Sequence, residues 1–92
     1  MNRLECRVGL GAMAHERVLY VEGLDRTYET WADTRDVRFL KGEHGLDKAE
    51  ALGEVDVVVV GTEPDRKAVL IELPNEVVLG SRRIWVSTSR VK

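Results

Sequence analysis

The sequence predicts an all-β protein, a small barrel or strongly curved antiparallel sheet of five to seven short strands, with at most one short helix near residues 46–52. Short alternating segments recur along the chain, turn-forming residues separate them, and the chain has only 92 residues. So many strands in so short a chain cannot form a large sandwich, and closing the sheet removes exposed edges. The helix rests on the capping-box spacing of Asp47 and Glu50. We expect one domain over residues 1–92.

Alternating side chains define the strands expected in the first half. Apolar residues alternate with polar residues or glycine over residues 3–10, which predicts a half-buried strand. Residues 17–22 are rich in β-branched and aromatic types, and turn-forming residues join them to residues 27–31 as a hairpin. Residues 37–40 add one further short strand.

The clearest β pattern lies in the second half. Residues 54–60 and 67–73 flank a turn in which Pro64 suits the second position of a type I turn, so we expect a central hairpin. A glycine-first turn predicts a last hairpin between residues 76–79 and 82–86. The side chains expected in the core are Val57, Val59, Leu70 or their immediate neighbours.

Composition limits the classes of function. Acidic and basic residues nearly cancel, to a net charge of −2, which argues against binding a polyanion through bulk charge. No apolar stretch is long enough for a signal-peptide core or a membrane span. Cys6 is the only cysteine, so one chain cannot form an internal disulfide. We therefore expect a cytoplasmic protein.

The residues that could carry chemistry have simpler interpretations. Cys6 could be a nucleophile activated by His15 or His44, but it lies in register with core residues and is expected to be buried. His15 and Glu16, with His44 elsewhere, offer the minimum set of ligands for a metal, but neighbours on an extended chain point to opposite faces and do not converge unless the loop turns there. We therefore expect no catalytic residues, no metal site, no cofactor and no enzymatic activity.

The C-terminal segment shows the one local charge asymmetry. Arg82, Arg83, Arg90 and Lys92 occur there without an acidic residue, and Trp85 lies among them. Basic residues beside an aromatic ring can contact phosphates and stack on a base. The alternative is a solvated basic edge that discourages strand pairing between molecules.

The two tryptophans are the largest side chains available for a contact. In alternating strands Trp31 and Trp85 fall on the face opposite the aliphatic core residues, and exposed tryptophan often marks a contact surface. The alternative is that the rings close the ends of a barrel. The candidate binding residues are therefore Trp31, Arg82, Arg83, Trp85 and Arg90.

The layout of residues 84–92 is similar to the end of Src-homology-3-like (SH3-like) barrels, in which a strand runs into one helical turn and a very short last strand. The chain also resembles small bacterial proteins of uncharacterised function with such a barrel, mainly over residues 54–92. The shared positions are residues 6–9, 16–18, 73–74 and 82–84. The first loop, residues 11–15, lacks the acidic and aromatic residues of the peptide-binding members, so recognition of proline-rich peptides is not implied.

These observations favour a non-catalytic binding or interaction module, with an unknown protein or a second copy as the partner. A nucleic-acid-binding barrel that uses residues 82–92 is the alternative, and no membrane partner is expected. Several strands are apolar on both faces, so something must cover the outer one. We expect a homodimer with an interface of about 800 Å² or less per partner. Its predicted contacts are Val58, Val60, Val69, Ile71 and Trp85.

Overall fold

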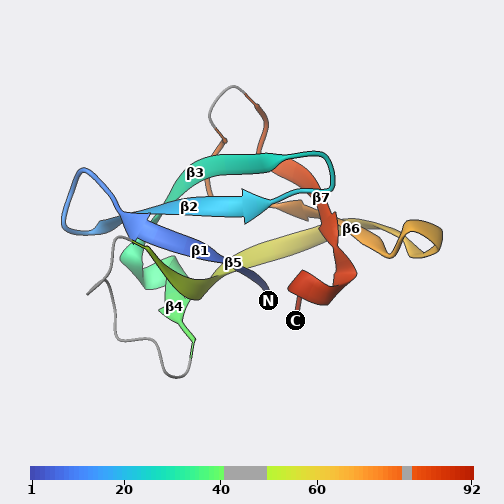
Figure 1. Cartoon of the computed structure of the whole chain (residues 1–92), viewed down its shortest axis with the longest axis horizontal. Helices are drawn as coiled ribbons and strands as arrows, with labels where there is room; N and C mark the ends of the chain where they lie inside the picture. The colour runs from blue at the N-terminus through green and yellow to red at the C-terminus, as the bar shows by residue number, and fades with distance from the viewer. Residues whose placement is uncertain (41–49, 78–79) are drawn as a thin grey trace.

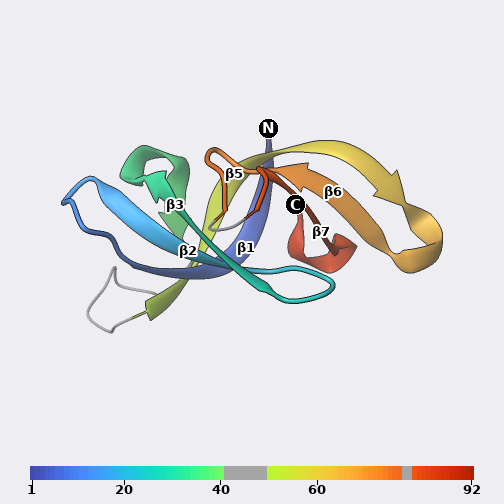
Figure 2. The ribbon, with the colours of Figure 1, turned by 90° about the horizontal axis from the view of Figure 1, so that it is seen from above.

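The computed structural model describes residues 1–40, 50–77 and 80–92. These residues form seven antiparallel strands that curl into a half-barrel, and the only helical segments among them are single 3-10 turns (Figures 1 and 2). The predicted fold class is confirmed. In the part of the chain that the structure describes, no helix is long and apolar enough to cross a membrane.

The strands follow the order β3-β2-β1-β5-β6-β7, and β4 pairs with β5 outside this path. Their bounds are β1 (Asn2–Leu10), β2 (Glu16–Glu22), β3 (Thr27–Asp33), β4 (Val37–Phe39), β5 (Glu50–Glu63), β6 (Ala68–Glu72) and β7 (Arg83–Ser87). The 3-10 turns are η1 (Thr34–Asp36), η2 (Pro64–Arg66) and η3 (Thr88–Arg90). Of the segment proposed as a short helix, residues 50–52 are strand and residues 46–49 lie outside the described residues.

The long strand β5 joins the two halves of the fold. Its first part pairs with β1, from Gly9 opposite Glu50 to Asn2 opposite Val57, and its second part pairs with β6. Both views place the β5–β6 hairpin and the β1–β2 loop at opposite ends of the molecule (Figures 1 and 2). The predicted central hairpin is therefore confirmed, and it extends the sheet away from β1.

A bulge interrupts the pairing of β5 with β6. Val59 lies opposite Ile71, but Gly61 lies opposite Leu70, so Val60 is an extra residue on β5. Bulges bend a strand and increase its twist. The strand can therefore leave the β1 ladder and curl into the second half of the barrel.

The inner face of the sheet forms the core. Val57 is 1% exposed, whereas the next residue, Val58, is 47% exposed, as expected for side chains that alternate along a strand. Val59 and Leu70 are half-buried, and Val69 and Ile71 are buried, so the core prediction for this hairpin is confirmed. The remaining large, fully buried side chains are Leu4, Val8, Leu19, Val21, Val55, Leu73 and Val86.

The prediction that Val69 and Ile71 lie at a dimer contact is wrong. Both side chains are buried in the core of the same chain. On β6 they share the inner face, so the outward positions fall to Leu70 and Glu72, which are less buried. The run of apolar residues on β6 therefore fills one core and does not cover two faces.

The predicted last hairpin is also wrong, because β7 pairs with β6, from Ala68 opposite Ser87 to Glu72 opposite Arg83. Residues 76–77 belong to no strand, and residues 78–79 lie outside the described residues. The Asn75 side chain donates to the Trp31 carbonyl (3.0 Å), which turns this segment towards β3. Pairing with β6 lets the inner residues of β7 join the core.

The chain ends lie side by side (Figure 1). The Arg3 amide donates to the Lys92 carbonyl (3.0 Å) and the Lys92 amide donates to the Arg3 carbonyl (2.9 Å), while Leu4 and Val91 form an isolated β-bridge. The Ser87 side chain accepts a hydrogen bond from the Ser89 amide and so starts η3. The expected layout of strand, helical turn and very short strand is confirmed.

Two neighbouring valines test the assignment of faces. We expect Val57→Ala to lower the free energy of unfolding by about 2 kcal/mol, because it removes core methyl groups and leaves a cavity. We expect Val58→Ala, on the solvent side, to change it by less than about 0.5 kcal/mol. Urea denaturation of both variants is the measurement. Equal losses, or a larger loss for Val58→Ala, would contradict the alternation.

Candidate functional site

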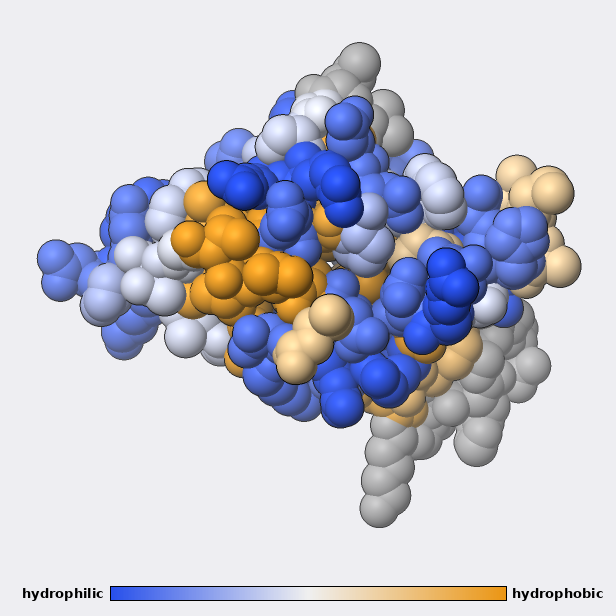
Figure 3. Space-filling model, turned by 180° about the vertical axis from the view of Figure 1, so that it is seen from behind, coloured by the Kyte–Doolittle hydropathy of each residue, from blue (hydrophilic) through white to orange (hydrophobic). Residues whose placement is uncertain are grey.

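Exposed apolar side chains gather on the outer face of β5, β6 and β7. Val58 is 47% exposed and Val60 is 39% exposed, and Leu70 and Trp85 lie beside them, half-buried and directly opposite each other on β6 and β7. We call Val58, Val60, Leu70 and Trp85 the outer patch. Figure 3 shows an apolar surface on this side of the molecule, with charged residues around it.

The Trp85 ring lies across the sheet. A Cβ atom built on Gly61 would lie 3.5 Å from Leu70 Cβ and 3.9 Å from Trp85 Cη2, so the ring reaches over Leu70 towards β5. The Arg66 guanidinium lies 5.9 Å from the centre of the ring, a cation–π distance. Gly61 has no side chain that could cover the near edge of the ring. The Trp85 ring therefore forms an aromatic part of the outer patch that lies across the sheet.

Two ion pairs border the outer patch. Arg83 Nε lies 3.6 Å from Glu72 Oε1 at one end, and Arg66 Nη1 lies 2.8 Å from Glu63 Oε2 at the other. Exposed ion pairs of this kind contribute only about 0–1 kcal/mol to folding. Their contribution is therefore mainly a pattern of charge that a partner must match.

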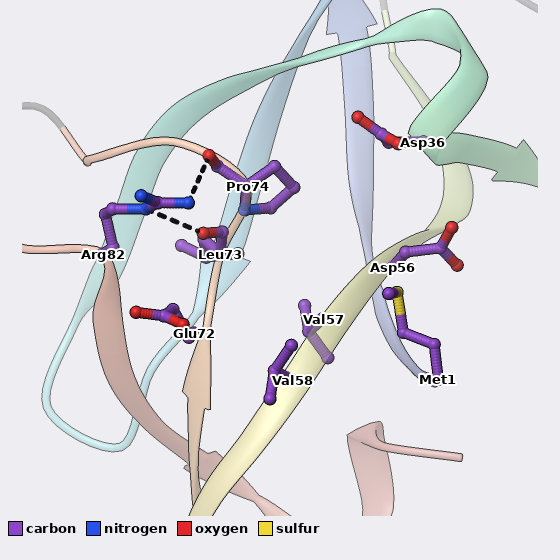
Figure 4. A pocket seen from close by; sticks show the side chains of 9 residues that line it. All are labelled: Met1, Asp36, Asp56, Val57, Val58, Glu72, Leu73, Pro74 and Arg82. Atoms are coloured by element: carbon purple, nitrogen blue, oxygen red, sulfur yellow. Dashed lines mark hydrogen bonds between the residues drawn. The ribbon is translucent and has the colours of Figure 1, made fainter.

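A slot opens next to Val58, where β5 passes from β4 to β6 (Figure 4). Neither β4 nor β6 pairs with Asp56 or Val57, which leaves a gap in the ladder among the described residues. The slot has a volume of about 180 Å³, below the ~300–1,000 Å³ of common ligand pockets. Its lining residues are Met1, Asp36, Asp56, Val57, Val58, Glu72, Leu73, Pro74 and Arg82.

Several charged side chains of the slot have partners within the chain. Arg82 donates from Nε to the Leu73 carbonyl (3.2 Å) and from Nη2 to the Pro74 carbonyl (2.9 Å). On the other side, Arg38 donates to the Asp56 carboxylate (2.9 Å). Figure 4 shows Arg82 on one side of the slot and Asp36 and Asp56 on the other. The slot therefore suits one uncharged side chain at the margin of the outer patch better than an ionic ligand.

The other basic residues of the C-terminal segment neutralise carboxylates of the sheet. Arg90 Nη1 lies 3.8 Å from Glu5 Oε1, and Lys92 Nζ lies 3.3 Å from Glu54 Oε2. Glu54 is buried and also lies 4.0 Å from Arg3, so these cations compensate a carboxylate that would otherwise be costly to bury. These contacts give Arg90 and Lys92 a structural role.

The five predicted binding residues do not form one surface. Trp85 belongs to the outer patch and Arg83 borders it, whereas Arg82 lines the slot and Arg90 contacts β1. Trp31 is exposed on β3 near Asn75, whereas the Trp85 carbonyl accepts from Leu24 in the β2–β3 turn, at the far end of β3. Val58 and Val60 were predicted only as dimer contacts, and the side chains missing from both predictions are Leu70 and the slot acids Asp36, Asp56 and Glu72.

The interpretation of Cys6 as a core residue is confirmed. Its side chain is buried, and burial, with smaller contributions from Glu5 and Glu54, raises the pKa of the thiol to about 12. His15 is exposed in the β1–β2 loop, and His44 lies outside the described residues. Within the described ranges, no three His, Cys, Asp or Glu side chains gather in a way that could hold a metal ion.

The raised pKa of Cys6 gives a prediction for stability against pH. The folded thiol keeps its proton above the ordinary pKa of 9.0, whereas the unfolded thiol loses it there. The stability that Cys6 contributes is therefore complete below pH 9 and falls as the pH rises towards 12. We expect Cys6→Ala to lose less stability than the native chain over this range, measured by urea denaturation at each pH.

Labelling checks the same point independently. A thiol reagent at pH 8 should modify Cys6 only after the chain is unfolded, because the reactive thiolate is absent from the folded state. Rapid labelling of the folded protein, or parallel pH profiles for the native chain and Cys6→Ala, would contradict the burial of a neutral thiol.

Comparison with protein-family models, with curated proteins and with solved structures gives no match for this chain. The comparisons therefore say nothing about the outer patch and the slot. What they bind must be inferred from their own shape, exposure and charge.

Proposed function

We propose that this chain is a protein-interaction module without catalytic activity, and that the outer patch is its contact surface. The observation that supports this is the exposure of Val58 and Val60 beside the Trp85 ring, on strands whose opposite face already fills the core. Removing apolar surface from water is favourable by about 25 cal/mol per Å². A partner that covers these side chains gains this energy without disturbing the core.

The chemistry of the outer patch favours a protein as the partner. The cores of protein–protein contacts are enriched in aromatic residues and depleted in charge, and charged residues form the rim. Here Val58, Leu70 and Trp85 form the centre, and the Glu72–Arg83 pair forms part of the rim. The slot beside Val58 offers a place for one uncharged side chain of the partner.

The alternative of nucleic-acid binding through residues 82–92 receives less support from the contacts. A phosphate-binding surface needs several cations facing one way. Arg83, Arg90 and Lys92 each lie within 4.0 Å of a carboxylate of the same chain, and Arg82 donates to two backbone carbonyls. A phosphate backbone would have to displace these contacts one by one.

Site-specific photocrosslinking tests the proposed surface. A benzophenone amino acid at position 60, within the outer patch, is compared with the same group at Leu10, an apolar position at the end of β1 that is more exposed than Val60 (64% against 39%). A protein captured only from position 60 is then purified and titrated against the native chain. We expect Val58→Asp to weaken its binding at least about tenfold and Leu10→Asp to leave it unchanged.

Two results would overturn the proposal. One is that position 60 captures nothing that position 10 does not also capture. The other is that the captured protein binds Val58→Asp as tightly as the native chain while the variant keeps its native melting temperature.

A further inference from the structure

We propose that the partner of the outer patch is a second copy of this chain, related by a two-fold axis that runs between β6 and β7. This inference rests on the proposed function, because it uses the same surface, and it adds the identity of the partner. Its basis is the register of β6 and β7, in which Leu70 lies directly opposite Trp85 and Glu72 directly opposite Arg83. Both pairs project from the outer face.

The register makes this surface self-complementary. The proposed axis lies in the plane of the contact, parallel to β6 and β7 and midway between them. Rotation by 180° about this axis places each residue of β6 over its cross-strand partner on β7 of the second copy. Leu70 then faces Trp85 of the other copy, and Glu72 faces Arg83 of the other copy. An interface of this kind is isologous, so each contact is made twice.

The charged pair is available for this exchange. Within one chain Arg83 Nε is 3.6 Å from Glu72 Oε1, with 58% of the arginine and 33% of the glutamate side chain exposed. At this distance the Glu72 carboxylate does not use all the N–H donors of the Arg83 guanidinium, so several of these donors can reach a second carboxylate. In the dimer the two glutamates and two arginines form one alternating network, and each charge keeps a partner of opposite sign.

Apolar residues at the two edges of the outer patch also come together in the proposed dimer. Val60 lies on β5, on one side of β6, and Leu24 lies on the other side of β7, where its amide donates to the Trp85 carbonyl (3.0 Å). Both residues are exposed, and the same rotation moves the β5 side of one copy towards the Leu24 side of the other. Apolar residues thus flank the charged network from both directions.

The size of the surface predicts a weak, reversible dimer. The outer patch has four residues, of which Leu70 and Trp85 are half-buried, whereas a standard stable interface has about 20–30 residues per partner. We therefore expect the native chain to change from monomer to dimer between about 10 µM and 1 mM, as measured by sedimentation equilibrium.

Charge reversal tests the exchanged pair directly. In Glu72→Arg both charges of the pair are positive, and in Arg83→Glu both are negative, so each variant alone faces like charges across the axis. We expect each variant to dimerise at least about tenfold more weakly than the native chain. In an equimolar mixture every arginine faces a glutamate, and we expect an affinity within about threefold of the native value.

The matched control is the ion pair between Glu5 on β1 and Arg90 in η3. Glu5→Arg and Arg90→Glu reverse the same charges in a pair 3.8 Å apart, and both variants should dimerise like the native chain. If Glu72→Arg and Arg83→Glu are both folded but their equimolar mixture stays monomeric, the proposed axis is wrong. A native chain that is monomeric up to about 1 mM would overturn self-association itself, while leaving the photocrosslinking result to decide the proposed function.

Dilution of the native chain gives a test that needs no variant. Backbone amide spectra recorded between about 20 µM and 1 mM should shift mainly at Leu70, Glu72, Arg83 and Trp85 and their neighbours. Concentration-dependent shifts confined to β2 and β3 would place the contact elsewhere and overturn the inference.

Discussion

The fold depends on one strand that serves two ladders. β5 pairs with β1 along its first part and with β6 along its second, so it must turn a corner without breaking. The extra residue at Val60 supplies this bend, because a bulge increases the local twist. Without the bend, Val57 and Ile71 could not face the same core, and the last three strands would form a separate sheet with too little apolar surface to fold alone.

The same bulge determines what the outer face offers. Val60 and Gly61 together oppose Leu70, and the missing side chain of Gly61 lets the Trp85 ring reach across the sheet. An apolar patch on the convex side is therefore a by-product of the geometry that closes the barrel. The ion pairs beside it give the patch its pattern of charge.

Much of the fold could be predicted from local sequence. Alternation in β1, the turn residues before β3 and the Pro64 turn each reflect interactions between near neighbours, and each prediction was correct. The partner of β7 depends on distant residues, so a glycine-first turn suggested the wrong hairpin. Which face of the sheet Val69 and Ile71 occupy depends on how the side-chain alternation of β6 is aligned with that of β5, and this alignment is the phase of β6. The 3-10 turn and the left-handed backbone of Lys67 (φ 51°) set that phase, and a run of valines carries no sign of it.

The candidate site was harder to predict for the same reason. An outer face was one of the two positions that local sequence allowed for Trp85, and the alternation of buried residues within β7 places it there. Local sequence could not show that Arg90 and Lys92 meet Glu5 and Glu54, since those contacts join opposite ends of the chain. A basic segment that looked free in sequence is therefore largely neutralised in three dimensions.

Cross-strand nuclear Overhauser effects between β5 and β6 test the central role of the bulge most directly. The account predicts backbone contacts of Val59 with Ile71 and of Thr62 with Val69, with Val60 and Gly61 both close to Leu70. A continuous ladder in which Val60 pairs with Leu70 and Gly61 pairs with Val69 would contradict it. In that case the corner in β5, and the outer face derived from it, would need another cause.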